Sequence, residues 1–185
     1  AISSMILMLG PAGAGKSLQG QILALRHGWK WFSMGAALRQ HATPEIQVLL
    51  DQGKIVPNHI TNDLAARLFH EEADLRHLIV DGYPRNMEQA GYLVDYLSGR
   101  DGDSPNVVMV LDIGKEEVLR RLRQRGRSDD NDEAIAERLA IFAREGQAII
   151  DFLAENGFDI ERVAAGRTVG QVHDQIDEII CRVLQ

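Results

Sequence analysis

The sequence predicts a three-layer α/β fold, in which a central parallel sheet of five strands is covered by helices on both faces. Short and nearly continuous apolar runs alternate along the chain with longer segments of helical periodicity. This alternation is typical of parallel strands that are buried on both faces. A glycine-rich turn also follows the first apolar run and precedes a helical segment, as expected where a strand leads into a crossover helix.

The predicted elements follow from the hydrophobic periodicity. The five predicted strands are residues 5–9, 29–33, 77–81, 106–113 and 158–165. The six predicted helices are residues 16–27, 58–72, 87–97, 115–124, 131–155 and 168–184. No internal repeat or linker divides the chain, so residues 5–185 are expected to form a single core. Residues 1–4 precede a natural initiator, Met5, and are expected to be foreign to the protein.

Composition narrows the class of function. The chain has 185 residues and a net charge of -7, which disfavours a large nucleic-acid-binding surface. It contains no apolar run of membrane-spanning length and no signal peptide, so we expect a soluble cytoplasmic protein. The single cysteine, Cys181, excludes an internal disulfide and a cysteine-rich zinc site. Because it lies in an apolar helical run, Cys181 is expected to be a small core residue.

The first glycine-rich turn has the spacing of a phosphate-binding loop. Residues 10–17 read GPAGAGKS and lie between a predicted strand and a predicted helix. Glycines allow the backbone N–H groups to point inward, and the helix adds the positive end of its dipole. Lys16 would reach the outer phosphates, and the Ser17 hydroxyl would be a magnesium ligand. The alternative is a glycine-rich turn without a ligand.

A second turn, DGYPRN at residues 81–86, also carries charged side chains. Asp81 ends a strand expected to neighbour the first one, where a carboxylate can hold magnesium through water. Arg85 is placed to meet a second anion opposite the phosphate loop. The alternative is a purely structural turn, because Asp-Gly and Pro are common turn formers.

At this point the chain resembles the nucleoside monophosphate kinase family of phosphate-loop kinases, and adenylate kinases most closely. Five segments match family motifs in the family's order: GPAGAGKSLQ, WFSMGAALR, GKIVPNHIT, DGYPRNMEQA and RGRSDDNDEAIAERL. The resemblance covers nearly all of the chain. It implies a phosphate-loop fold with a small helical acceptor-binding excursion at residues 34–63, trimmed relative to the family, and a very short lid at residues 125–130.

The resemblance also implies roles for particular residues. The expected ATP-binding residues are Gly13, Ala14, Gly15, Lys16, Ser17, Leu18, Arg121, Arg125, Gly166 and Arg167. The expected AMP-binding residues are Met34, Arg39, Lys54, Ile55, Val56, Gly82, Arg85, Gln89, Arg127 and Arg138. Lys16, Arg85, Arg125, Arg127 and Arg138 are expected to stabilise the transferring phosphoryl group. Asp129 and Asp130 are the lid's acidic pair, Ser17 and Asp81 hold Mg²⁺ largely through water, and a monomer is expected.

The arginines can also be interpreted from their spacing. Arg121 and Arg125 are four residues apart on a helix and therefore share a face. The alternative there is a solvated basic face, with Glu117–Arg121 and Glu116–Arg120 pairs. Arg138 lies beside an apolar stripe, so its charge needs a partner, either a polyphosphate or a carboxylate such as Asp129. Residues 130–133, DNDE, also fit a helix capping box.

The resemblance implies the reaction ATP + AMP ⇌ 2 ADP. A phosphate acceptor is already an anion and needs no general base, which agrees with the many arginines at candidate site positions. Some residues depart from the family pattern: Leu18 and Met34 each stand where a threonine is usual. Gln89 favours AMP, whereas Asn86 is typical of pyrimidine monophosphate kinases. The alternatives are therefore a UMP/CMP kinase, a nucleotide-binding module without transferase activity, and a small-metabolite kinase with a hydroxyl acceptor.

Overall fold

The computed structural model describes residues 5–71, 77–98, 106–127 and 130–183, and it confirms the predicted fold class. Within these residues, five parallel strands form one sheet in the order β2-β3-β1-β4-β5. Each strand lies within one residue or two of a predicted apolar run. The strands are β1 (Ile6–Leu9), β2 (Lys30–Ser33), β3 (Leu78–Asp81), β4 (Val107–Asp112) and β5 (Asp159–Ala164).

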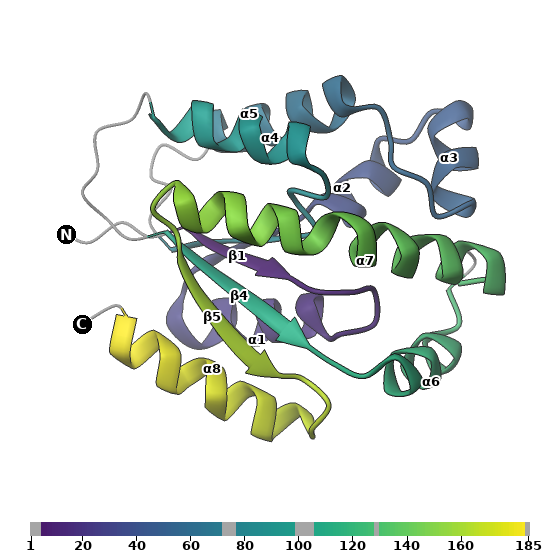
Figure 1. Cartoon of the computed structure of the whole chain (residues 1–185). Coiled ribbons are helices and arrows are strands. Elements are labelled where there is room, and N and C mark those ends of the chain that lie inside the picture. The colour runs from purple at the N-terminus through teal and green to yellow at the C-terminus, as the bar shows by residue number, and fades with distance from the viewer. Residues whose placement is uncertain (1–4, 72–76, 99–105, 128–129, 184–185) are drawn as a thin grey trace.

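Helices cover both faces of the sheet (Figure 1). One face carries α1 (Lys16–His27) and α8 (Val169–Val183), and the other carries α4 (Asn58–Glu71), α5 (Met87–Ser98) and α7 (Asp132–Glu155). Three further helices lie toward the end to which the strands point: α2 (Met34–Gln40), α3 (Pro44–Asp51) and α6 (Lys115–Arg125). No helix in the described ranges is long and apolar enough to cross a membrane.

The alternation of side chains along the strands explains the two cores. In β1, Leu7 and Leu9 pack with residues of α4, α5 and α7. Ile6 and Met8 pack on the opposite face with residues of α1 and α8. Since both sets are apolar and buried, the strand reads in the sequence as one continuous apolar run.

Two short helices, α2 and α3, were not individually predicted. They have seven and eight residues, too few to show a clear helical period. The residues before the two helices indicate their starts better than periodicity does, because serine and threonine are preferred N-caps. The Ser33 side chain accepts from the Ala36 N–H, and the Thr43 side chain accepts from the Ile46 N–H.

The prediction that Cys181 is a core residue was wrong, because its side chain is exposed. The buried stripe of α8 runs through Val172, Ile176, Ile179 and Ile180. A residue that follows Ile180 is turned about 100° further around the helix, which carries it out of this stripe.

The strand order places the glycine-rich turn and the end of β3 side by side. Strand β1 lies between β3 and β4, and Met8 is paired in register with Asp81. The chain leaves β1 toward one edge of the sheet and leaves β3 toward the other. A crevice therefore forms beyond the carboxyl ends of these strands, where ligands of open α/β sheets bind.

The end of α3 is held closely against the start of α7. Asn131 Nδ2 donates to the Asp51 carbonyl at 3.1 Å, and Arg138 Nη2 donates to the Leu50 carbonyl at 3.3 Å. Gly53 adopts a φ of 69°, and a methyl group added there would lie 2.5 Å from the Ala134 carbonyl oxygen. This contact joins residues 34–63 to the main body of the fold.

We therefore expect Gly53→Ala to lower the free energy of unfolding by about 1–3 kcal/mol more than Gly157→Ala, because overpacking adds to backbone strain. Gly157 is the matched control: its φ is 86°, but an added methyl group would meet nothing within 4 Å. Urea unfolding of both variants measures the difference. Equal destabilisation would contradict the close approach at Gly53.

Candidate active site

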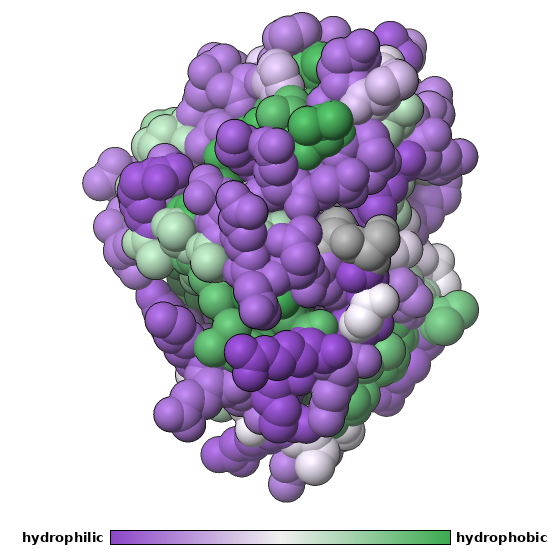
Figure 2. Space-filling view, turned by 90° about the vertical axis from the view of Figure 1, so that its right-hand side faces the viewer, coloured by the Kyte–Doolittle hydropathy of each residue, from purple (hydrophilic) through white to green (hydrophobic). Residues whose placement is uncertain are grey.

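A cavity of about 400 Å³ opens beyond the carboxyl ends of the strands. Figure 2 shows this end of the molecule, where hydrophilic side chains surround a hollow with apolar residues in its depth. Eight cationic side chains line the cavity: Lys16, Arg39, Lys54, Arg85, Arg121, Arg125, Arg127 and Arg138. Asp81 is the one acidic residue among the described lining residues. A chain of net charge -7 thus concentrates positive charge at one site, as an anionic ligand requires.

The phosphate loop has the predicted form. Gly15, with a φ of 95°, is the N-cap of α1 and makes no side-chain cap hydrogen bond. The first N–H groups of α1 are thus left without a side-chain cap, the arrangement that suits an anion. Lys16 Nζ donates to the carbonyls of Gly10 and Pro11, both at 2.9 Å. Gly13, Ser17 and Leu18 line the same cavity, and Ala14 lines the neighbouring one.

The amino group of Lys16 is electrostatically unusual. Burial is the main cause that lowers its pKa to about 8. The carboxylate of Asp81 opposes this shift, whereas the positive charges of Arg85 and Arg125 add to it. Lys16 is thus held in a site where further negative charge would stabilise its protonated form.

Ser17 and Asp81 form the pair expected for magnesium. The Ser17 hydroxyl donates to Asp81 Oδ2, and Asp81 is 4% exposed. Both groups offer hard oxygen ligands at the mouth of the phosphate loop, which suits Mg²⁺. The described residues contain no cluster of three His, Cys, Asp or Glu side chains that could hold a metal by themselves. Mg²⁺ commonly binds through one or two carboxylates together with substrate phosphates and water.

Two arginines converge at Gly35, at the start of α2. A methyl group added to Gly35 would lie 3.4 Å from Arg39 Nη1 and 3.6 Å from Arg85 Nη2. Arg85 is oriented by a hydrogen bond from its Nε to the Gly82 carbonyl at 2.9 Å. Gly35 therefore leaves room for two guanidinium groups, a suitable anion site. Gly35 was not predicted as a site residue, although it lies in the motif WFSMGAALR, because its role depends on two arginines that meet it only in the folded chain.

Asp130 connects the arginines of the predicted lid. Its side chain is 1% exposed and accepts from Arg125 Nε at 2.7 Å and from Arg138 Nη1 at 3.1 Å. The Arg127 backbone N–H also donates to Asp130, at 3.3 Å. Burial raises the pKa of Asp130, but the hydrogen bonds and charge of Arg125 outweigh it and leave the pKa below its ordinary value. Asp129, the other member of the predicted acidic pair, lies outside the described residues.

The predicted capping box at residues 130–133 was wrong in its details. The N-cap of α7 is Asn131, whose Oδ1 accepts from the Ala134 N–H at 2.8 Å. Asp130 therefore does not cap the helix, and its carboxylate is available to the arginines. Among the described residues, Asp130 is a carboxylate partner of Arg138, with Arg138 Nη1 and Asp130 Oδ1 3.1 Å apart.

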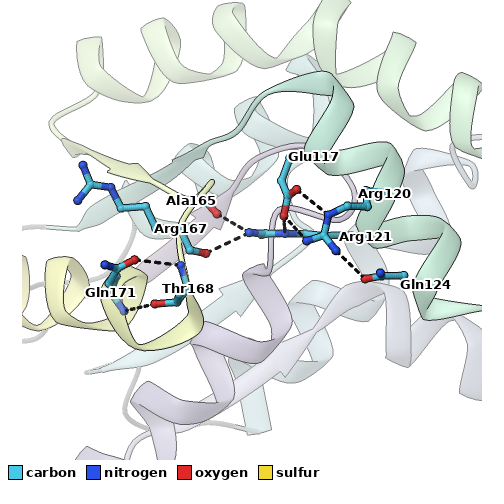
Figure 3. A network of polar contacts seen from close by, with 8 residues as sticks. All are labelled: Glu117, Arg120, Arg121, Gln124, Ala165, Arg167, Thr168 and Gln171. Carbon is cyan, nitrogen blue, oxygen red and sulfur yellow. Dashed lines mark hydrogen bonds and ion pairs between the residues drawn. The ribbon is translucent and has the colours of Figure 1, made fainter.

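A second cavity, of about 670 Å³, lies beside the phosphate loop and is lined by Gly166, Arg167 and Arg121. Figure 3 shows the polar network at its edge. The predicted Glu117–Arg121 pair is present, with Arg121 Nε donating to Glu117 Oε1 at 2.8 Å. The predicted Glu116–Arg120 pair was wrong, because Arg120 binds Glu117 instead, with a closest distance of 2.6 Å. Glu117 was not among the predicted site residues.

The residues expected to face the acceptor base are largely buried. Met34, Val56 and Gln89 are 0%, 3% and 1% exposed, and none lines either cavity described above. Ile55 lines a smaller cavity of about 100 Å³, together with Arg85 and Arg138. Met34, Val56 and Gln89 are therefore buried, and their side chains do not line the cavity of the phosphate loop in this structure.

A cluster of carboxamides accounts for the buried position of Gln89. Its Oε1 accepts from the Arg85 N–H at 2.8 Å, and its Nε2 donates to Asn58 Oδ1 at 3.0 Å. Asn86 Nδ2 donates to the same Asn58 oxygen at 2.9 Å. Asn58 was not predicted as a site residue, because an asparagine at the start of a helix is also an ordinary cap.

We expect an NMR titration of the Lys16 side chain to show a midpoint near pH 8. Asp81→Asn should move this midpoint lower, because it removes the carboxylate that raises the pKa. Asp112→Asn, which changes an exposed carboxylate outside the cavity, is the control and should leave the midpoint unchanged. A midpoint above roughly pH 10, near the ordinary value for lysine, would contradict the burial of this group.

Comparisons with known proteins agree with this geometry. Residues 8–158 match the family described as adenylate kinase. A protein of Mycolicibacterium smegmatis named adenylate kinase is 32% identical over 185 residues, covering 97% of this chain and 96% of the relative. An adenylate kinase of Mycobacterium ulcerans is 34% identical and covers 97% of both chains. One from Thermobifida fusca is 32% identical over 90% of this chain and 93% of its own length.

Proposed function

The chain belongs to the adenylate kinase family of phosphotransferases, and from this premise we propose that it transfers the γ-phosphoryl group of ATP reversibly to AMP, giving two ADP. One observation carries the proposal: cationic side chains from separate segments of the chain line one cavity around the phosphate loop. Phosphoryl transfer depends on positioning and on stabilising negative charge, and this cavity offers both.

On the donor side, we propose that the phosphate loop and Lys16 bind the phosphates of ATP. The uncapped N-terminus of α1 supports this, because its N–H groups favour a bound anion. The donor base would occupy the second cavity, between Arg121 and the Gly166–Arg167 turn. Mg²⁺ would be held by Ser17 and Asp81 through water and would neutralise phosphate charge.

On the acceptor side, we propose that residues 34–63 and the turn after β3 bind AMP. Arg39 and Arg85, which converge at Gly35, would hold its phosphate. Gln89 can read an adenine edge because an amide offers one donor and one acceptor. Since this amide is now hydrogen-bonded internally, AMP would bind after the carboxamide cluster rearranges or by sharing its remaining hydrogen-bonding positions.

The reaction needs no general base, because the attacking group is already an anionic phosphate. Lys16 and Arg85 would stabilise the phosphoryl group from the side of the phosphate loop and the turn after β3. Arg125, Arg127 and Arg138, from α6 to α7, would stabilise it as well. Water must be excluded so that ATP is not hydrolysed. The segment 125–130 would provide the cover, with Asp130 keeping its arginines together until phosphates compete for them.

One structural feature argues against a hydroxyl acceptor. Such a kinase needs a carboxylate base that faces the hydroxyl. The one carboxylate among the described lining residues, Asp81, already accepts from Ser17. A UMP/CMP kinase remains the second candidate because of Asn86, a partly exposed residue whose Oδ1 accepts from the Gln89 N–H.

The substrate test measures turnover with Mg-ATP and AMP, CMP, UMP or dTMP in turn. We expect AMP to give the highest kcat/KM. Faster turnover with CMP or UMP would favour the second candidate. No acceptor-dependent turnover would favour a binding module without transferase activity.

We expect Lys16→Met to lower kcat by about 100-fold or more while the protein stays folded, because the lysine charge acts in the transition state. Lys115→Met is the matched control, since this exposed lysine begins α6 and does not line the cavity. Circular dichroism checks folding. Retained activity in Lys16→Met would contradict the loop assignment.

We further propose that the protein acts as a monomer in the cytoplasm, where ATP and AMP meet. Light scattering during turnover tests the oligomeric state.

A further inference from the structure

Glu117 binds two consecutive arginines of α6 with one carboxylate (Figure 3). Its Oε1 accepts from Arg121 Nε at 2.8 Å and from Arg120 Nη2 at 2.6 Å. Its Oε2 accepts from Arg120 Nε at 2.8 Å. The two arginines differ in surroundings, because Arg120 has a side chain that is 56% exposed whereas that of Arg121 is 25% exposed.

The other side of the Arg121 guanidinium is held by backbone. Its Nη2 donates to the Ala165 carbonyl at 3.0 Å and to the Arg167 carbonyl at 3.2 Å. Glu117 on α6 and the turn before α8 therefore hold two of its three nitrogens. The guanidinium is planar, so these contacts determine the orientation of the whole group.

The third nitrogen lies next to the phosphate loop. A methyl group added to Gly15 would lie 3.9 Å from Arg121 Nη1. The guanidinium thus spans the cavity edge from the phosphate loop to the turn that contains Gly166 and Arg167. A flat cation in this place can stack on a nucleobase whose phosphates sit in the loop.

We infer that Glu117 is a positioning residue for the donor nucleotide, which orients Arg121 across the base-binding cavity without contacting the transferred phosphoryl group. The inference rests on the proposed function, because it assigns the second cavity to the donor base. Hydrogen bonds from Arg120 and Arg121 lower the pKa of Glu117 to about 2, so its carboxylate stays charged at working pH.

The experiment compares the binding of ATP with that of inorganic tripolyphosphate, which has no base, using calorimetry on the intact protein. We expect Glu117→Ala to weaken ATP about tenfold and to leave tripolyphosphate unchanged. Glu117→Gln should recover part of the ATP affinity, since its amide oxygen can still accept from Arg121 Nε. Glu116→Ala is the matched control, because Glu116 is an exposed neighbour that does not line the cavity.

Kinetics and a double-mutant cycle complete the test. KM for ATP should rise in Glu117→Ala, whereas kcat and KM for AMP stay unchanged. In an Arg121→Ala background, Glu117→Ala should have no further effect. Unchanged ATP affinity, an equal loss of tripolyphosphate affinity, or additive effects would overturn the inference. Calorimetry needs no acceptor, so lack of turnover with AMP would refute the proposed function while leaving this role measurable.

Discussion

Electrostatic repulsion within one cavity is the constraint on which the rest of this site depends. Eight lysine and arginine side chains line a space of about 400 Å³, and their mutual repulsion favours a bound polyanion. Burial is the main cause that lowers the pKa of Lys16, and the charges of Arg85 and Arg125 add to this shift against the opposing charge of Asp81. A ligand that brings negative charge relieves the same repulsion. The positive charge of the cavity would therefore favour both the binding of phosphates and the stabilisation of negative charge during transfer.

Three carboxylates divide this positive charge into separate groups. Asp81 lies with Ser17 at the phosphate loop, Asp130 holds Arg125 and Arg138, and Glu117 holds Arg121 outside the reacting centre. The three acids come from different places in the fold: Asp81 ends β3, Glu117 lies in α6, and Asp130 precedes α7. Under the proposed function, the three groups would serve the metal ion, the transferred phosphoryl group and the donor base, respectively.

The acceptor side is organised by packing as much as by charge. Gly53 brings the end of α3 against the backbone of Ala134, and Arg138 of α7 donates to the Leu50 carbonyl at the end of α3. Beside the proposed acceptor site, Asn58 accepts from both Gln89 and Asn86, the two residues whose identities favour different bases. Under the proposed function, base preference would therefore depend on this hydrogen-bonded cluster rather than on a single side chain.

The sequence alone determined the strands, the long helices and the phosphate loop, because each of these depends on local periodicity or on a motif of fixed spacing. All eight cationic residues that line the cavity were also predicted, and most of their roles came from the resemblance to the family. It did not determine which acid would hold which arginine. Glu116 and Glu117 are neighbours, and each lies four residues before an arginine, so spacing predicts one ion pair for each. Only the structure shows that Glu117 binds both Arg120 and Arg121. Likewise, α2 and α3 are too short for a periodic signal, and Cys181 is exposed although its neighbours are apolar.

Gly35, Gly53 and the Asn58 cluster became visible only in the tertiary structure, because their roles depend on contacts between segments that lie far apart in the chain.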